Sequence, residues 1–493
     1  MEKRKKVARI IGSGIAGIAA AIRISRKGYE VHVHEANSYP GGKLSEIRLG
    51  DYRFDAGPSL FTLPEKVDEL FKICNEEPRD HFNYLKKKES CRYFWEDGKK
   101  IIAHASIDKF VTEAEVNLGE SPMAIRMHLL MAQNQYRSTS EFFLERSLHK
   151  LKTYLRFSIF KTITFLPSLK LFTTMHSVHS RRFRTKYMIQ LFDRYATFNG
   201  SSPYKAPGTL CMIPHLEFGI GTFLPLKGMV DITNSLKALA ERQGVNFHFN
   251  ERVSRISSEK KKANGLTVTR NNKEVFLPSD LVISNMDVTP TYRKLLPYLK
   301  EPLKILSQER SSSALIFYWG VNAEFPELNL HNILFSKDYK AEFDCLFETR
   351  TLSSDPTVYI NITSKDIPND APEKSENWFV MINVPSNSGQ DWDSIRLKAR
   401  QLIIDKIFQV LGKDISSFIE CEDYLDPRLI ESKTSSDRGS LYGSSSNSIF
   451  SAFLRHPNER ALNNLYFCGG SAHPGGGIPL CLLSAKIVSD AVS

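Results

Sequence analysis

Three glycines near the start of the chain have the spacing of a turn that binds a phosphate group. Gly12, Gly14 and Gly17 follow a β-branched run at residues 7–11 and open an apolar segment at residues 15–27. Gly12 permits a tight turn, Gly14 lets a pyrophosphate approach the positive end of a helix, and Gly17 lets that helix pack closely on the strand. The pattern predicts dinucleotide binding, and the alternative is a glycine-rich turn with a purely structural role. The predicted contacts of this turn are Gly12, Ser13, Gly14, Ile15, Ala16 and Gly17.

A carboxylate closes the next expected strand, at residues 30–35. Glu35 follows Gly12 by twenty-three residues, the separation at which a strand–helix–strand unit brings an acidic side chain to the ribose of a bound dinucleotide. In that position it accepts hydrogen bonds from the ribose hydroxyls and repels the 2′-phosphate of NADP. Glu35 and its neighbour Ala36 are therefore predicted contacts.

Two further turns favour FAD over NAD. The first is Pro40-Gly41-Gly42-Lys43, in which a glycine pair allows a second close approach to a phosphate and Lys43 offers a countercharge. The alternative for Lys43 is a solvated surface lysine. The second turn, Gly57-Pro58-Ser59, follows at a short distance along the chain. An FAD molecule buried along its length needs these additional contacts, whereas NAD does not. The predicted contacts are Gly41, Gly42, Lys43, Gly57, Pro58 and Ser59.

A glycine-rich loop near the C-terminus, residues 469–479, precedes an apolar helix expected to start near residue 480. So many glycines indicate a backbone that lies against a large flat group. Pro479 suits a first helical turn, whose free N–H groups point at an anion or an electron-rich acceptor. Such a helix start favours the reduction of a flavin ring. The predicted contacts are Gly469, Gly470, Gly477 and Ile478. His473 faces a substrate or is a loop histidine bonded to backbone.

The bulk properties narrow the class of protein. The 493 residues are enough for two or three domains, and no stretch of 18 uncharged apolar residues indicates a transmembrane helix. Glycines interrupt the apolar run after the basic N-terminus, so no signal peptide is expected. Seven scattered cysteines form no CxxC pair, which favours a reducing compartment and argues against a disulfide framework or a metal site.

The positive charge is concentrated in one segment that runs from Arg146 to Phe192. It contains ten basic residues and no Asp or Glu, in a chain whose net charge is +11. Bulky apolar residues are interspersed, and such a mixture is attracted to an anionic bilayer by roughly 1 kcal/mol per basic residue. The alternatives are a helical core with snorkelling lysines and arginines and, without any supporting motif, nucleic-acid binding. A peripheral protein on the cytoplasmic face of the membrane, with no nucleic-acid partner, is therefore expected.

The expected elements combine into an α/β protein. A Rossmann-like FAD-binding domain is discontinuous in sequence, and an α+β substrate domain and a helical membrane-associating region are inserted into it. Residues from about 106 to 195 are expected to be mostly helical, with a break at Pro167. The expected FAD-binding segments are residues 1–75, 221–290 and 456–493, the helical region is 76–220, and the substrate domain is 291–455.

Together the motifs resemble the bacterial phytoene desaturase family, from one end of the chain to the other and in the same order. The resemblance rests on the turns described above and on Phe54-Asp55-Ala56-Gly57-Pro58-Ser59, Pro225-Leu226-Lys227-Gly228-Met229 and His473-Pro474-Gly475-Gly476-Gly477-Ile478-Pro479. It implies an FAD that takes hydride from a long isoprenoid chain delivered by the membrane. It also implies that the backbone of Val253 contacts the adenine.

Within the family, several segments resemble the branch that acts on 1-hydroxycarotenoids, the 3,4-desaturases. They are residues 194–207, 213–217, 330–333, 376–379 and 439–444. Two departures stand out. Lys227 replaces the first of two glycines usual before Met229, which puts the tightness of that turn in question. The loop Gly469-Gly470-Ser471 lacks the acidic residue that related amine oxidases have in the corresponding loop, which argues against an amine oxidase.

Removing two hydrogens from adjacent carbons of a polyene requires a hydride acceptor and a proton acceptor. The flavin provides the first. A weak base suffices for the second because the oxidised chain is a delocalised cation. His215, Glu217 and His473 are candidates, with structural hydrogen bonding as the alternative, and no catalytic residue is assigned. The apolar substrate requires an apolar, aromatic tunnel, in keeping with the 31 Phe and 18 Tyr residues.

The leading hypothesis is 3,4-desaturation of a 1-hydroxylated acyclic carotenoid, with oxygen or a quinone as electron acceptor. The alternatives are desaturation of phytoene itself and a reductase or isomerase like retinol saturase. A different class is a membrane-surface flavoprotein that binds lipid without catalysis.

Overall fold

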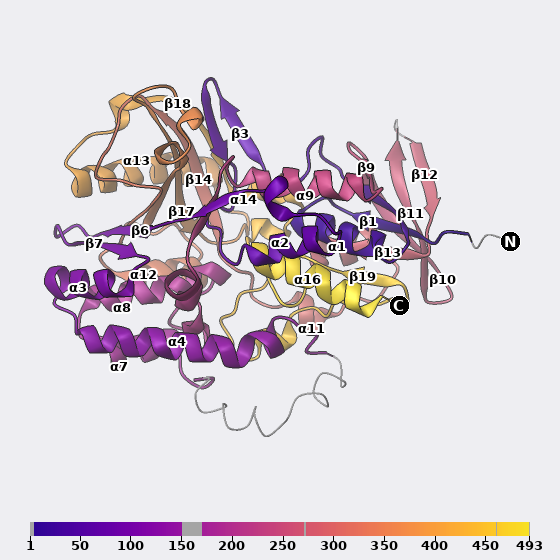
Figure 1. The fold of residues 1–493 in the computed structure, drawn as a ribbon, viewed down its shortest axis with the longest axis horizontal. Helices are drawn as coiled ribbons and strands as arrows, with labels where there is room; N and C mark the ends of the chain where they lie inside the picture. Colours follow the sequence, from indigo (N-terminus) through magenta and orange to yellow (C-terminus); the bar gives the residue numbers. More distant parts are fainter. Residues whose placement is uncertain (1–3, 150–169, 271–272, 460, 493) are drawn as a thin grey trace.

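The structure, a computed structural model, describes residues 4–149, 170–270, 273–459 and 461–492. Figure 1 shows two lobes, each with its own sheet: the sheet that contains the N-terminal strand lies at the right of the view, and a larger sheet lies at the left. A layer of helices lies below the larger sheet in that view.

The first lobe is built on a parallel sheet. Across the sheet its strands are β19 (Leu465–Phe467), β13 (Leu281–Ser284), β1 (Val7–Ile11), β2 (Glu30–His34) and β9 (Asn246–His248). The helices around it are α1 (Ile15–Ser25), α9 (Val230–Arg242) and α16 (Ile478–Ala491). Helix α1 packs against both of the others, and its fully buried Ala19, Ala20 and Ala21 permit that close approach. The prediction of a discontinuous Rossmann-like fold is confirmed.

A small antiparallel sheet extends this lobe. It consists of β10 (Arg252–Glu259), β11 (Lys262–Arg270) and β12 (Lys273–Pro278). Its apolar side chains pack into a core that it shares with strands β13 and β19; they include Val253, Ile256, Leu266 and Val268. The sheet therefore holds the segment around Val253 against the edge of the parallel sheet.

The second lobe contains a mixed sheet. Across the sheet its strands are β18 (Ile419–Leu425), β14 (Ser313–Val321), β17 (Glu376–Val384), β16 (Val358–Ile362), β15 (His331–Leu334), β6 (Glu89–Phe94) and β7 (Lys100–His104). Only β15 and β6 pair in parallel. The period of two along β14 gives its faces different roles. Leu315, Phe317 and Trp319 pack against helix α13 (Trp392–Leu411), and Ala314 and Ile316 line a cavity.

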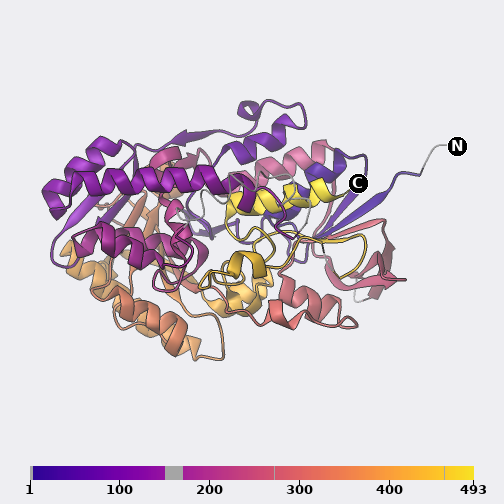
Figure 2. The same cartoon turned by 90° about the horizontal axis from the view of Figure 1, so that it is seen from below.

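The helical layer covers the other end of this lobe. Its helices are α3 (Ile107–Leu118), α4 (Pro122–Phe143), α7 (Met175–Arg182) and α8 (Lys186–Asp193). Ser106 and Ser121 cap the first two helices through their hydroxyl groups. Figure 2 shows α4, in purple, extending along the molecule toward the yellow C-terminal helix. The prediction of a mostly helical region is confirmed for its described part, whereas the predicted break at Pro167 and the middle of the basic segment lie outside the described residues.

The remaining helices and strands are short. They are β3 (Glu46–Leu49), β4 (Tyr52–Asp55), α2 (Glu65–Lys72), β5 (Tyr84–Lys86), β8 (Phe223–Pro225), α10 (Val288–Pro290), α11 (Leu303–Leu306), α12 (Tyr339–Asp344), α14 (Pro427–Thr434) and α15 (Ser451–Leu454). Single 3-10 or π turns are η1 (Pro78–Asp80), η3 (Arg194–Asn199), η4 (Gly208–Met212), η5 (Leu216–Ile220), η6 (Thr291–Leu295), η7 (Cys345–Thr349), η8 (Thr363–Lys365), η9 (Pro368–Asp370), η10 (Ser416–Phe418) and η11 (Asp437–Gly439).

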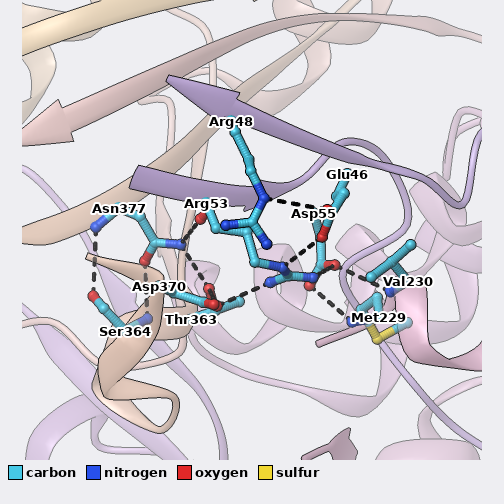
Figure 3. Close-up of polar contacts among 10 residues, drawn as sticks. All are labelled: Glu46, Arg48, Arg53, Asp55, Met229, Val230, Thr363, Ser364, Asp370 and Asn377. Atoms are coloured by element: carbon cyan, nitrogen blue, oxygen red, sulfur yellow. Dashed lines mark hydrogen bonds and ion pairs between the residues drawn. The ribbon is translucent and has the colours of Figure 1, made fainter. Parts of the chain in front are cut away.

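A buried arginine joins the two lobes (Figure 3). Arg53 on β4 donates to Glu46 Oε2 at 2.9 Å, Asp55 Oδ1 at 2.7 Å and Asp370 Oδ2 at 3.0 Å. Asp370 belongs to η9, which precedes the strand β17 of the second lobe. Asp55 in turn accepts from the backbone N–H of Met229 at the start of α9, at 2.9 Å. The positive end of the helix dipole stabilises a carboxylate at this place. One guanidinium therefore fixes a hairpin, a helix start and the neighbouring lobe together.

The contacts of Arg53 also show why the turn before Met229 tolerates Lys227 in place of a glycine. Lys227 is exposed and has no positive φ, so a side chain at this position costs nothing in backbone strain. Gly228 has a φ of 82°, and a Cβ atom there would lie 2.3 Å from Arg53 Nη2. Only the second glycine of the usual pair is required at this turn.

Among the residues that the structure describes, no helix combines the length and apolar character needed to cross a bilayer. The domain limits expected from the sequence remain a prediction.

Candidate functional site

One cavity of about 950 Å³ lies between the lobes. On one side it is lined by the glycine-rich turns of the first lobe, and on the other by strands of the larger sheet and by the ends of the helical layer. Seventeen of the nineteen predicted contacts line it: Gly12, Gly14, Ile15, Ala16, Glu35, Ala36, Gly41, Gly42, Lys43, Gly57, Pro58, Ser59, Val253, Gly469, Gly470, Gly477 and Ile478. Ser13 and Gly17 are not among the lining residues.

Ser13 and Gly17 support the first glycine turn without lining the cavity. A Cβ atom on Gly17 would lie 2.2 Å from the carbonyl oxygen of Gly12, so only glycine lets α1 approach the end of β1 this closely. The backbone N–H and the hydroxyl of Ser13 both donate to Glu35 Oε2 at 2.8 Å. Gly14 is the N-cap of α1, and the free N–H groups of that helix start face the cavity wall.

Glu35 is fixed at the end of β2. Besides the two bonds from Ser13, its Oε1 accepts from the backbone N–H of Asn37 at 2.9 Å. The side chain is 6% exposed and lines the cavity. A carboxylate oxygen accepts more than one hydrogen bond, so acceptor capacity remains for the hydroxyls of a ribose.

The Gly41–Gly42 turn crosses in front of α1. Gly41 N–H donates to the Ser13 carbonyl oxygen at 2.9 Å, and its φ is 97°. A Cβ atom on Gly41 would lie 2.2 Å from the carbonyl oxygen of Leu44. On Gly42, where φ is 59°, the nearest atom to such a Cβ is the Cα of Gly14 at 3.8 Å. The space beside this backbone is the cavity itself.

Lys43 is partly buried and its ammonium group is bonded to backbone oxygens, which argues against its interpretation as a solvated surface lysine. Its Nζ donates to the carbonyl oxygens of Ser440 at 3.2 Å and Leu441 at 2.9 Å. Burial lowers the pKa of Lys43 to about 8, against the opposing effect of the Asp287 carboxylate. Its expected role as a countercharge for a phosphate stays a prediction.

The C-terminal loop leads into α16 at the same edge of the sheet. Gly469 and Gly477 have φ values of 100° and 105°, and a Cβ atom on Gly477 would meet nothing within 4 Å. The guanidinium of Arg455 donates to the carbonyl oxygens of Tyr442 at 3.0 Å and Gly470 at 2.9 Å. Arg455, which also lines the cavity, thus fixes the loop, whose glycine backbone forms part of the cavity wall.

The three candidate bases have separate surroundings. His473 lines the cavity, its Nε2 lies 2.8 Å from the carbonyl oxygen of Arg146, and burial lowers its pKa to about 4. Glu217 also lines the cavity and accepts from the hydroxyl of Tyr195 at 2.7 Å. His215 is not among the lining residues, and burial lowers its pKa. No catalytic role follows from these contacts for any of the three.

The cavity wall also contains a polar group that was not expected from the sequence. Ser59 Oγ lies 2.7 Å from the hydroxyl of Tyr359, which lies 2.7 Å from His331 Nδ1. His331 had entered only as part of a segment that resembles one branch of the family. Nothing local could have indicated this group, because His331 and Tyr359 are 28 residues apart and Ser59 is 300 residues before Tyr359.

The cavity fits FAD. A dinucleotide needs bare backbone at the pyrophosphate, a helix start and an acceptor for the ribose, and Gly12, Gly14, α1 and Glu35 offer these at one edge of the parallel sheet. A flavin ring needs a second uncovered surface, which Gly477 and its neighbours offer before α16.

Comparison with known proteins agrees with this geometry. Residues 15–493 match the family described as flavin containing amine oxidoreductase. The chain is 51% identical over 488 residues to the 1-hydroxycarotenoid 3,4-desaturase of Flavobacterium sp. (strain P99-3), which covers 99% of both chains. It is 29% identical over 520 residues to the phytoene desaturase of Fusarium fujikuroi, covering 100% of this chain and 90% of that one. A double mutant of putrescine oxidase has the same fold, with a TM-score of 0.65, 11% identity, and 99% and 98% of the two chains covered.

Proposed function

The chain belongs to the family of flavin-containing amine oxidoreductases, and we propose that it is a carotenoid desaturase that introduces the 3,4 double bond into 1-hydroxycarotenoids. The prediction of an FAD-dependent oxidoreductase and the resemblance to the phytoene desaturases are confirmed by the family match and by the relative that is 51% identical. The substrate is carried over from the name of that relative.

We propose that the cavity-lining glycine turns hold the FAD. Gly12, Ser13, Gly14, Ile15, Ala16 and Gly17 shape the pyrophosphate site, Glu35 and Ala36 the ribose site, and Val253 the adenine site. Gly41, Gly42, Lys43, Gly57, Pro58, Ser59, Gly469, Gly470, Gly477 and Ile478 surround the remainder of the molecule. Bound there, FAD supplies the acceptor for the hydride of the substrate.

We base the proposed substrate class on the apolar half of the same cavity. Ala314 and Ile316 of β14 and Phe379 and Met381 of β17 face it from the larger sheet, opposite the glycine turns. A polyene offers almost no polar groups, so it is bound by apolar burial at about 25 cal/mol per Å². These side chains position the polyene against the cofactor site and exclude water from it. The family name refers to amines. The loop Gly469-Gly470-Ser471 has no acidic side chain, which favours an apolar substrate over an amine.

The test is conversion by the FAD-loaded protein in liposomes, with a 1-hydroxycarotenoid, phytoene and putrescine as separate substrates. We expect the 1-hydroxycarotenoid alone to lose two hydrogens, measured as a mass decrease and a red-shifted absorption spectrum. Conversion of phytoene but not of the hydroxylated substrate would identify a phytoene desaturase instead.

The remaining outcomes separate the other classes. A product that gains two hydrogens, or keeps its mass, identifies a reductase or an isomerase. Bound FAD that none of the substrates reduces without oxygen identifies a flavoprotein that binds lipid without catalysis. Repeating the reaction with oxygen and with a quinone identifies the electron acceptor, which we propose to be one of the two.

We further propose that the protein docks on the cytoplasmic face of the membrane beside the cavity. Leu171, which lines the cavity, precedes Phe172, whose side chain is 87% exposed. On helix α4, Met123 and Met127 are also exposed. Exposed apolar side chains beside a basic surface are typical of proteins that take a substrate from a bilayer.

A further inference from the structure

The residue that follows the middle strand of the parallel sheet lies between two glycine-rich turns of the cavity. Strand β13 pairs with β1 on one side and with β19 on the other. Asn285 is the first residue after β13, Gly12 is the first after β1, and Gly469 is the second after β19. The backbone N–H of Asn285 donates to the carbonyl oxygen of Ile11 at 2.9 Å. The pairing of β13 with β1 thus continues up to the first turn.

The side chain of Asn285 fills space that a glycine leaves open in each turn. A Cβ atom on Gly14 would lie 2.7 Å from Asn285 Nδ2. A Cβ atom on Gly469, in the other turn, would lie 2.7 Å from Asn285 Oδ1. Both separations are well inside van der Waals contact. One amide group therefore packs against both turns at once.

The backbone of Gly14 shows that this packing is a separate reason for its glycine. Gly14 has a φ of -62° and a ψ of 165°, a conformation that any residue adopts without strain. The backbone therefore does not require glycine at this position. A side chain there is excluded by what lies beside it, and in the protein itself the nearest atom is the amide nitrogen of Asn285.

The hydrogen bonds of the amide connect the two turns. Asn285 Nδ2 donates to the carbonyl oxygen of Gly12 at 3.4 Å, and Cys468 Sγ, in the residue before Gly469, lies 3.9 Å from Asn285 Oδ1. Both contacts are long, so packing contributes more than hydrogen bonding to this connection. Asn285 is partly buried and lines the cavity. The amide thus joins the turns and is itself part of the cavity wall.

We infer that Asn285 is a positioning residue, which fixes the turn at Gly12–Gly14 and the loop at Gly469 at the separation that one FAD molecule spans. This inference rests on the proposed FAD site and adds the residue that couples its two halves. A ligand that contacts both turns gains affinity from their fixed separation, because less ordering is needed when it binds. A ligand that contacts only the first turn gains nothing from it.

The test compares FAD with ADP, which has the adenosine and the two phosphates of FAD but no flavin. In the proposed site ADP reaches the turn at Gly12–Gly14 and does not reach the loop at Gly469. The dissociation constants of both ligands are measured by calorimetric titration of the full-length protein after removal of FAD. The variant is Asn285→Ala, which removes the amide from between the turns.

The matched control is Asn464→Ala at the opposite end of the same strands. Asn464 precedes β19, and its Nδ2 donates to the carbonyl oxygen of Asp280, which precedes β13, at 2.7 Å. It is partly buried but does not line the cavity. Its φ of 63° makes alanine strained, so the control loses stability without a change at the turns.

We expect Asn285→Ala to weaken FAD binding by about tenfold or more and to change the dissociation constant of ADP by less than about threefold. Asn464→Ala should keep the wild-type ratio of the two constants. A general loss of structure weakens both ligands alike. An equal loss for FAD and ADP in Asn285→Ala, or no loss for either, would therefore overturn the inference.

A second measurement tests the packing without a ligand. Gly14→Ala places a Cβ atom against the Asn285 amide, so it should lower the urea midpoint of the FAD-free protein, and adding Asn285→Ala should recover part of that loss. Additive losses contradict the contact. If Asn285→Ala does not fold, Asn285→Ser takes its place in both measurements. Wild-type protein that does not bind FAD refutes the proposed site itself, whereas FAD binding indifferent to Asn285 refutes only the role of this residue.

Discussion

At the scale of single residues, Arg53 shows how charge can be buried in a stable fold. Its side chain is 7% exposed, and burial alone would lower its pKa, but the carboxylates of Asp55 and Asp370 raise it instead. Burial raises the pKa of both carboxyl groups, and the guanidinium opposes that rise. Each of these three charges is stabilised by its partners, because burial removes the hydration that would otherwise stabilise it.

Removing the guanidinium should therefore be costly. Arg53→Met leaves two buried carboxylates unpaired, and we expect the free energy of unfolding to fall by about 3–5 kcal/mol, measured by urea denaturation followed by circular dichroism. Arg48 is the matched control, since it pairs directly with Arg53 across the β3–β4 hairpin. Its side chain is 66% exposed and lies 3.4 Å from Glu46, so Arg48→Met should cost about 0–1 kcal/mol. Equal losses in the two variants would contradict the role given to burial.

At the scale of elements, the cofactor site follows from the direction of the strands. Strands β1 and β19 lie in one parallel sheet, each in register with β13 between them. Their carboxyl ends therefore lie at the same edge. Each strand leads through a glycine-rich turn into a helix, α1 or α16, whose positive end faces the same cavity. Two helix starts some 460 residues apart in sequence thus reach one ligand.

A matched pair of glycines tests this arrangement. Gly477 has a φ of 105° and lines the cavity, and Gly244 has a φ of 79° in an exposed turn after α9. Neither would bring a Cβ atom within 4 Å of another atom, so alanine imposes backbone strain of about 1–2 kcal/mol at both. We expect Gly477→Ala to weaken FAD binding by about tenfold or more, measured by titration of the apoprotein, and Gly244→Ala to leave it unchanged. Identical FAD affinities in the two variants would show that the cofactor does not approach this loop.

At the scale of the whole molecule, the cavity opens between lobes with different tasks. The parallel sheet presents backbone, which suits a charged and extended cofactor, and the mixed sheet presents alternate apolar side chains, which suit a polyene. The basic helix α7 lies in the helical layer below the larger sheet in Figure 1. The exposed Phe172 precedes this helix by three residues in the chain. With the docking that we propose, an apolar substrate would pass from a bilayer into the cavity without crossing water.

Charge reversal tests the docking. The triple variant Arg181→Glu, Arg182→Glu, Arg184→Glu removes positive charge from α7 and the residues after it, and each basic residue near an anionic surface contributes about 1 kcal/mol. We expect binding to anionic liposomes to fall by at least about tenfold in a sedimentation assay. The control Lys260→Glu, Lys261→Glu, Lys262→Glu changes the net charge equally at exposed positions on the β10–β11 hairpin. Equal losses for the two triple variants would show that only the net charge matters.

Much of the cofactor site could be predicted from the sequence because its parts are local. The turn at Gly12, the doublet Gly41–Gly42 and the loop before α16 are each contained in a few residues, and each has one physical reason for its glycines. The sequence predicted the close helix–strand packing at Gly17, but it could not show that Ser13 and Gly17 stay outside the cavity wall, since lining a cavity is a property of the assembled fold.

The sequence by itself determined the class of this protein, because a backbone that must touch phosphates and a flat ring needs glycine wherever a Cβ atom would intervene. Only the tertiary structure decided which polar groups line the cavity. Ser59 and the pair His331 and Tyr359 come from distant parts of the chain, and they meet through hydrogen bonds of 2.7 Å. Burial and pairing arise from packing, and no pattern in the sequence contains them.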